Sequence, residues 1–201
     1  LLGHEYYAYT TSDLSGHKTG LPGGGIYELD AAAVIVGTGS STDEDRIESV
    51  FSRIGYSYDD KYYLSGSWRT DGSSRFAPNT RWGYFPAASV GWRMSDESFL
   101  RNVKWLDDLK LRASVGQTGN AQIGNSEYLA LYGMTNIDLG NGLTSQVYPS
   151  QIANNDLGWE KNTQYNIGLD VSLWRGTLGF TADYYYSKTT DMLFDVPVSS
   201  V

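Results

Sequence analysis

The sequence predicts an all-β fold, an antiparallel meander of about seven strands that forms part of a large transmembrane β-barrel. Three observations carry this prediction. Apolar and polar residues alternate with period two along much of the chain, long and short connections between the expected strands also alternate, and Tyr and Trp gather near both strand ends. Membrane strands alternate in this way because one face meets lipid while the other faces the lumen.

The composition favours a protein that lies at an interface. Among 201 residues, 16 Tyr and 6 Trp outnumber 6 Phe, so most aromatic rings carry a polar group. The net charge of −8 lacks the basic surface that a nucleic-acid binder needs, so no nucleic-acid partner is expected. The absence of Cys excludes disulfides, cysteine zinc sites and thiol catalysis. The longest apolar run, from Ala31 to Val36, is too short for a transmembrane helix.

The clearest strands form a hairpin around Arg175 and Gly176. The odd-numbered residues from 165 to 173 are apolar or aromatic, and so are the even-numbered residues from 178 to 186. A two-residue loop places Leu173 opposite Leu178 and Tyr165 opposite Tyr186, which brings all of these side chains to one face. Because a slip of one residue would destroy this match, the pattern fixes the register.

A second hairpin is predicted around the turn residues Asp59, Asp60 and Lys61. Three turn residues pair Tyr58 with Tyr62, and this register also places Tyr56 opposite Leu64, Ile54 opposite Gly66 and Ser52 opposite Trp68. Further strands are predicted over residues 82–94 and 109–117, and a weaker one over 3–12. Between two of them, Ser95 is expected to cap a short helical turn over residues 97–101.

The connections between these strands fall into two classes. Long connections are expected over about residues 13–48, 72–81 and 118–162, and short ones over 59–61, 95–108 and 175–176. In a meander, all long connections then lie at one end and all short ones at the other, as in outer-membrane barrels. We expect the long connections to face outward from the cell, where they are candidates for contact with a ligand or partner.

Ten aromatic residues are predicted to form two membrane girdles that bracket an aliphatic band. They are Tyr56, Tyr58, Trp92 and Trp174 near the short turns, and Trp68, Trp82, Tyr84, Tyr165, Tyr184 and Tyr186 near the long connections. The alternative is a soluble all-β carbohydrate-binding module that uses its exposed Tyr and Trp on sugars. An enzyme is the third hypothesis, but His4 and His17 occur without any supporting motif. No catalytic, cofactor-binding or metal-binding residue is predicted.

Ten segments resemble the SusC/RagA-type TonB-dependent outer-membrane transporters of Bacteroidetes, in the same order and almost from end to end. They are LGHEYY (2–7), SYDDKYY (57–63), DGSSRF (71–76), RWGYFP (81–86), SVGWR (89–93), LKLRAS (109–114), GQTGN (116–120), LGWE (157–160), QYNIGLD (164–170) and FTADYYY (180–186). Such transporters have a C-terminal barrel of about 22 strands that is filled by an N-terminal plug.

The resemblance implies that residues 1–201 are a partial barrel domain, from the second half of the barrel, in the bacterial outer membrane. We expect neither a plug nor a signal peptide within this stretch. The implied partners are a SusD-like surface lipoprotein, the TonB complex through a missing N-terminal part, outer-membrane lipid, and a glycan or peptide substrate. No cofactor is implied.

Overall fold

The computed structural model describes residues 1–138, 140 and 142–194 of the chain. The described residues form nine strands and two short 3-10 helices, one after β1 and one after β4, without any longer helix. The elements are β1 (Leu2–Thr19), η1 (Leu29–Ala31), β2 (Val34–Tyr58), β3 (Tyr62–Ser73), β4 (Trp82–Arg93), η2 (Met94–Asp96), β5 (Leu106–Asn120), β6 (Leu131–Asp138), β7 (Leu143–Gln151), β8 (Glu160–Leu173) and β9 (Leu178–Thr190).

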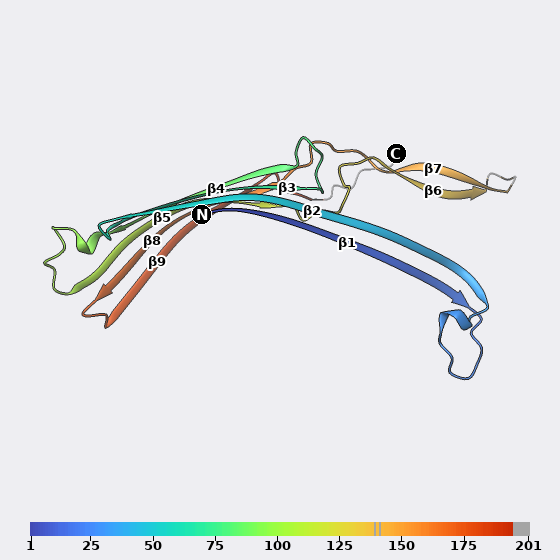
Figure 1. Cartoon of the computed structure of the whole chain (residues 1–201), viewed down its shortest axis with the longest axis horizontal. Helices are drawn as coiled ribbons and strands as arrows, with labels where there is room; N and C mark the ends of the chain where they lie inside the picture. Colours follow the sequence, from blue (N-terminus) through green and yellow to red (C-terminus); the bar gives the residue numbers. More distant parts are fainter. Residues whose placement is uncertain (139, 141, 195–201) are drawn as a thin grey trace.

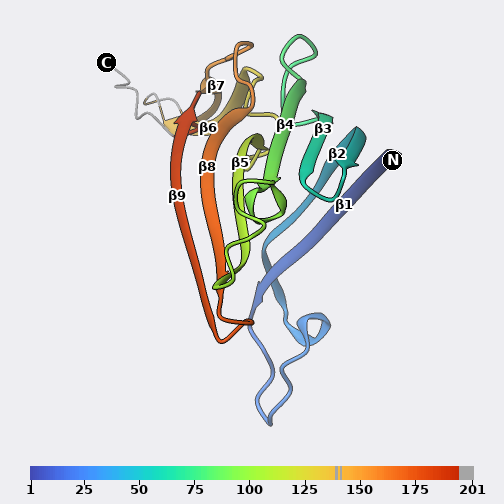
Figure 2. The same cartoon turned by 90° about the vertical axis from the view of Figure 1, so that its left-hand side faces the viewer.

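Seven of the strands form one antiparallel sheet in the order β1-β2-β3-β4-β5-β8-β9. Figure 2 shows them side by side in a single curved sheet, with β1 at one edge and β9 at the other. The remaining strands, β6 and β7, pair only with each other. The predicted all-β meander is therefore confirmed. In the part of the chain that the structure describes, no helix is long and apolar enough to cross a membrane.

Both predicted hairpin registers are confirmed. Leu173 pairs with Leu178 and Tyr165 with Tyr186, while Tyr58 pairs with Tyr62 in the other hairpin, which also pairs Ser52 with Trp68. In the first turn, positive φ angles occur at Gly176, as expected, and also at Trp174 and Arg175. The apolar residues thus decide the register even where the turn residues adopt a left-handed conformation that side chains disfavour.

The short and long connections lie at opposite ends of the sheet, as Figure 1 shows. We call these the short-turn end and the long-connection end. The expectation of a long loop over residues 13–48 was wrong, however, because β1 continues to Thr19 and β2 begins at Val34. The loop itself covers only residues 20–33, and the β1–β2 hairpin extends well beyond the neighbouring strands.

The other long connections differ from each other. The one after β3 covers residues 74–81, close to the expected range. The segment expected as a loop over residues 118–162 begins and ends within β5 and β8, and it contains the β6–β7 hairpin, which the sequence did not predict. These two strands were not predicted because their period-two alternation is weak: Gly133 interrupts the pattern in β6 and Pro149 interrupts it in β7.

The predicted helix cap at Ser95 was wrong. Ser95 lies inside η2, and its Oγ donates a hydrogen bond to the carboxylate of Asp108 at 3.0 Å. A turn does follow, because the amides of Leu100 and Arg101 both donate to the carbonyl of Glu97, at 3.0 and 2.9 Å. The hydroxyl therefore fixes the short connection to the start of β5 instead of capping this turn.

The buried core is small and lies at the long-connection end. Phe76, Phe85 and Trp159 pack together there, and each is less than a tenth exposed. Elsewhere large apolar side chains are open, as Ile54 at 76% and Ile167 at 56% exposure show. A sheet that leaves so many apolar side chains uncovered needs another apolar medium in contact with them.

Candidate functional site

The outer face of the sheet is defined here as the face that carries Ile54, Leu64, Val90, Ala113 and Ile167. The registers place Ile54, Leu64 and Val90 on the same face. Leu64 pairs with Val90 on one side and with Tyr56 on the other, and Tyr56 is two residues from Ile54 on the same strand. Val90 pairs with Ala113, and Ala113 with Ile167. Four of the five are large aliphatic residues without any polar group, so this band suits contact with hydrocarbon.

Aromatic rings flank the aliphatic band at the short-turn end. The rings of Tyr58, Tyr62 and Trp92 stack across three strands, with centroids 6.4 and 6.5 Å apart. Tyr56 follows on the same strand face, and Trp174 lies exposed in the β8–β9 turn. The predicted girdle residues Tyr56, Tyr58 and Trp92 thus share this end of the outer face, whereas Trp174 lies beside it in the turn, outside the strand ladder.

A second group of rings lies on the outer face towards the long-connection end. Trp68 and Tyr84 stack with centroids 6.3 Å apart, and Tyr165 and Tyr186 lie 6.4 Å apart on β8 and β9. The other two predicted members, Trp82 and Tyr184, take outer-face positions on β4 and β9 and are exposed as well. The structure therefore brings nine of the ten residues to two levels of one face, with Trp174 in the adjoining turn, while their contact with a membrane stays a prediction.

Glu97 holds the polar groups of the short-turn rings. Its carboxylate accepts hydrogen bonds from the Tyr62 hydroxyl at 2.5 Å and from the Trp92 indole nitrogen at 3.2 Å. These two bonds, that from Tyr62 above all, hold the pKa of Glu97 below its ordinary value. Lys61 lies nearby, and its hydrogen bond to Asp59 raises the pKa of the ammonium group. These hydrogen bonds thus attach the connection between β4 and β5 to the aromatic rings of Tyr62 and Trp92.

The opposite, inner face carries fixed charges. Arg112 binds Asp170 through two hydrogen bonds, of 2.7 and 3.0 Å, and reaches Asp183 at 3.2 Å. Gly168 lies between them, as the strand partner of both Arg112 and Asp183. A side chain at Gly168 would collide with the guanidinium group. This glycine therefore lets one arginine bridge three strands.

A second charged group lies on β1, β2 and β3. Arg69 donates to Asp71 at 2.7 Å and to the Ser49 hydroxyl at 3.0 Å, and it lies 3.5 Å from Glu5. Between the two groups, Lys110 lies over the ring of Tyr63, 4.5 Å from its centroid. The inner face is therefore polar and carries both signs of charge, as the lining of an aqueous lumen requires.

Sequence reasoning did not single out these inner-face residues. Their signal was present, because Arg112, Asp170 and Asp183 occupy the polar positions of three alternating strands. What the pattern could not show is which charges meet, since their partners lie 58 and 71 residues away.

The two histidines share no site. His4 lies 3.1 Å from Glu48 near the start of β1, whereas His17 is exposed close to its end. Thirteen residues of extended strand separate them by roughly 40 Å. Among the residues that the structure describes, no group of three or more His, Asp or Glu side chains is arranged to hold a metal ion.

A curved, open antiparallel sheet with an apolar outer face, a charged inner face and connections sorted by length is a section of the wall of a transmembrane β-barrel. A family model described as "TonB dependent receptor-like, beta-barrel" matches residues 1–201. The chain belongs to this family, whose barrels lie in the bacterial outer membrane. Family membership confirms the prediction that the chain is no enzyme and decides against a separate carbohydrate-binding module.

Similar proteins place the chain among SusC/RagA-type barrels. It is 42% identical to TonB-dependent receptor P39 of Formosa agariphila over 161 residues, which cover 80% of this chain and 15% of the relative. It is 39% identical to TonB-dependent receptor SusC of Bacteroides thetaiotaomicron over 155 residues, or 75% of this chain and 15% of that protein.

A solved structure of the RagAB peptide transporter superimposes with a TM-score of 0.86 at 31% identity. The match covers 98% of this chain and 22% of the solved chain. The chain thus spans less than a quarter of the length of these proteins.

Proposed function

We propose that this chain is a wall segment of an importer that takes up glycans or peptides across the outer membrane, together with a SusD-like surface lipoprotein and energised by the TonB complex. The observation that carries the proposal is the match to the RagAB peptide transporter along 98% of the chain. A likeness of this extent means that the backbone of this chain follows a section of that transporter, and a section of wall is what this chain can contribute.

The charged inner face supports a role in passage. Arg112 and Arg69 are each held by carboxylates, so their charges remain fixed in place along the lumen. Fixed polar groups on a barrel wall tune which solutes pass. Neither group distinguishes a glycan from a peptide, because both kinds of solute form hydrogen bonds with charged side chains. Both substrate classes therefore stay within the proposal.

The long-connection end supports contact with a surface partner. The β6–β7 hairpin forms a sheet of its own, outside the wall, and exposes Tyr132, Met134 and Val147. Exposed apolar side chains on a projecting hairpin favour burial against another protein. We place the lipoprotein contact at this hairpin and the outer side of the membrane at this end.

The intact receptor offers a direct test. Residues 132–150 are replaced with a short Gly-Ser linker, and recovery of the tagged surface lipoprotein and uptake of a labelled nutrient are measured. Gln151 is kept, because its amide donates to the carbonyls of Ser126 and Leu129 at 2.9 and 2.8 Å. We expect recovery to fall at least about fivefold, which corresponds to about 1 kcal/mol of binding free energy.

The control changes a turn at the other end. Replacing Asp59 and Asp60 with Asn and Gly preserves a turn with two positive φ angles and should leave recovery of the lipoprotein unchanged. If the hairpin variant folds with normal yield and retains both the lipoprotein and full uptake, the proposed contact is wrong.

A further inference from the structure

The wall of the sheet is split at the long-connection end, between β4 and β5. The ladder between these strands runs only from Ala87 to Arg93 on β4. β4 nevertheless continues to Trp82, paired with β3, and β5 continues to Asn120, paired with β8. Residues 82–86 and 117–120 therefore diverge without forming a ladder, although each remains bound to its other neighbour.

Aromatic rings fill the base of this split. The ring centroids of Phe76 and Phe85 each lie 5.4 Å from that of Trp159. Side chains at Gly83 or Gly119 would overlap the Phe85 ring, so glycines on both strands make room for it. The Trp159 indole nitrogen donates to the carbonyl of Arg81 at 2.8 Å, which fixes its orientation.

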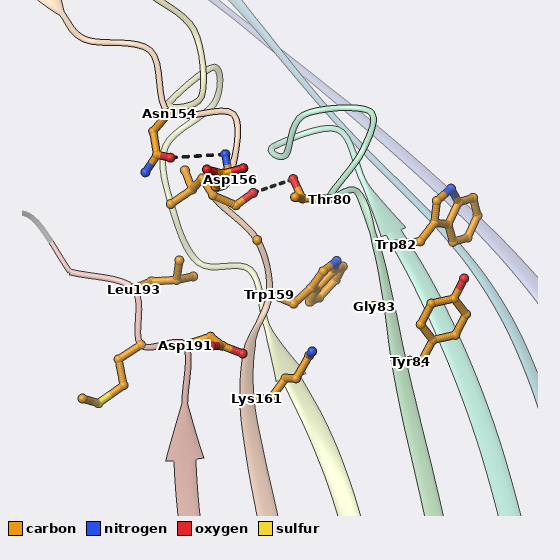
Figure 3. A pocket seen from close by; sticks show the side chains of 13 residues that line it. Thr80, Trp82, Gly83, Tyr84, Asn154, Asp156, Trp159, Lys161, Asp191 and Leu193 are labelled. Atoms are coloured by element: carbon orange, nitrogen blue, oxygen red, sulfur yellow. Dashed lines mark hydrogen bonds between the residues drawn. The ribbon is translucent and has the colours of Figure 1, made fainter.

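A pocket of about 460 Å³ lies over the packed rings. Trp82 and Tyr84 line it from β4, and Trp159, Lys161 and Asp191 line it from the other side, as Figure 3 shows. A hydrogen bond of 2.6 Å from the Thr80 hydroxyl to the carbonyl of Leu157 joins its two sides. A volume in the range of roughly 300–1,000 Å³ is typical of small-molecule sites.

The pocket lies at the level of the predicted long-connection girdle. Trp82, Tyr84 and Lys161 all occupy outer-face positions of their strands, and Trp82 and Tyr84 belong to that girdle. Girdle rings lie at the height of lipid head groups. A pocket in the wall at this height meets head groups of the outer leaflet, an inference that rests on the proposed membrane role of the chain.

The lining suits a molecule with many hydroxyl groups and an apolar part. Asp156 and Asp191 supply carboxylate acceptors and Lys161 supplies donors. Within the described part of the chain, none of these three charges forms an ion pair. Met192 and Leu193 add apolar surface on the same side as Asp191. We propose that this pocket binds the saccharide head group of a glycolipid of the outer leaflet.

The test uses the full-length receptor in nanodiscs of phosphatidylethanolamine, with and without lipopolysaccharide from the same bacterium as the probe. Native mass spectrometry counts the lipopolysaccharide molecules that stay bound to the receptor. The test variant combines Lys161→Gln with Asp191→Asn. Asn tolerates the positive φ of 55° at position 191, so this change removes the charge and spares the backbone. We expect at least a fivefold loss of bound lipopolysaccharide.

Lys188→Gln is the matched control, because Lys188 lies on β9, on the outer face and outside the pocket lining. This variant should retain the probe. The proposal is overturned if the wild-type receptor retains no lipopolysaccharide, if Lys188→Gln loses as much as the double variant, or if a large excess of the free core oligosaccharide displaces none of the probe. Nutrient uptake by the wild-type receptor is measured in parallel, since a failure of uptake concerns the proposed function and not this pocket.

Discussion

Glu97 illustrates how a partner, and not the residue type, sets the role of a side chain. Its sequence neighbours suggest only a polar turn, yet its carboxylate joins two aromatic rings from different strands. The same holds for Gly168, whose missing side chain lets Arg112 reach Asp183. At this scale, residues far apart in the sequence decide what each group does.

The lowered pKa of Glu97 predicts a loss of order in acid. The hydrogen bonds from Tyr62 and Trp92 stabilise the ionised carboxylate, so their contribution is complete above the ordinary pKa of 4.5. It disappears as the pH falls below 4.5 through the lowered pKa of the folded protein. Hydrogen exchange of residues 94–105, corrected for the intrinsic rate, should therefore accelerate at low pH in the intact receptor.

Glu97→Gln should abolish most of this pH dependence, because an amide does not titrate. Asp96→Asn serves as the control, since the Asp96 carboxylate takes no hydrogen bond from either ring among the described contacts. Equal protection of the wild-type turn above and below the transition would contradict the assigned role of Glu97.

At the scale of the strand, the alternation of residues decides which medium each face meets. Ile167 lies on the outer face and is exposed, whereas the adjacent Asn166 lies on the inner face. Neighbouring residues of β8 therefore face different environments, and one substitution at each position can separate them.

Ile167→Arg should prevent normal assembly of the intact barrel. An arginine on the lipid face near the bilayer midplane costs about 2–4 kcal/mol. Asn166→Arg should fold normally, because the lumen hydrates the charge. The fraction of barrel that keeps its folded, fast migration in unheated gel samples measures both effects. Equal yields of the two variants would show that the outer face does not meet hydrocarbon.

At the scale of the whole molecule, the two ends of the sheet differ in the length of their connections. The β1–β2 and β6–β7 hairpins extend from one end, and the turns at residues 59–61 and 174–177 close the other (Figure 1). Barrels of the outer membrane place the longer loops outside the cell, so this asymmetry predicts the orientation.

Single cysteines can test that orientation, because the chain has no Cys of its own. Gly23→Cys, in the loop between β1 and β2, should react with a membrane-impermeant maleimide on intact cells. Asp60→Cys, in the β2–β3 turn, should react only after the outer membrane is permeabilised. Labelling of Asp60→Cys in intact cells, with Gly23→Cys protected, would reverse the proposed orientation. The receptor without either cysteine supplies the background.

The sequence by itself determined the strands that cross the predicted membrane and the registers of two hairpins, those around residues 59–61 and 175–176. Alternation over several residues, as in 165–173 against 178–186, leaves one pairing that puts every apolar side chain on the same face. The sequence did not predict that β1 continues past residue 12 to Thr19, or that β2 begins before residue 49, at Val34. Both faces of that hairpin meet water, so no alternation marks it.

Only the tertiary structure decided the contacts between distant segments. Phe76, Phe85 and Trp159 meet because β4 and β5 diverge, and the charges on the inner face meet because Gly168 leaves room. Local patterns report which medium a residue faces, since burial repeats with the period of the strand. They carry no information about which neighbour it touches, because that depends on how strands remote in sequence are placed side by side.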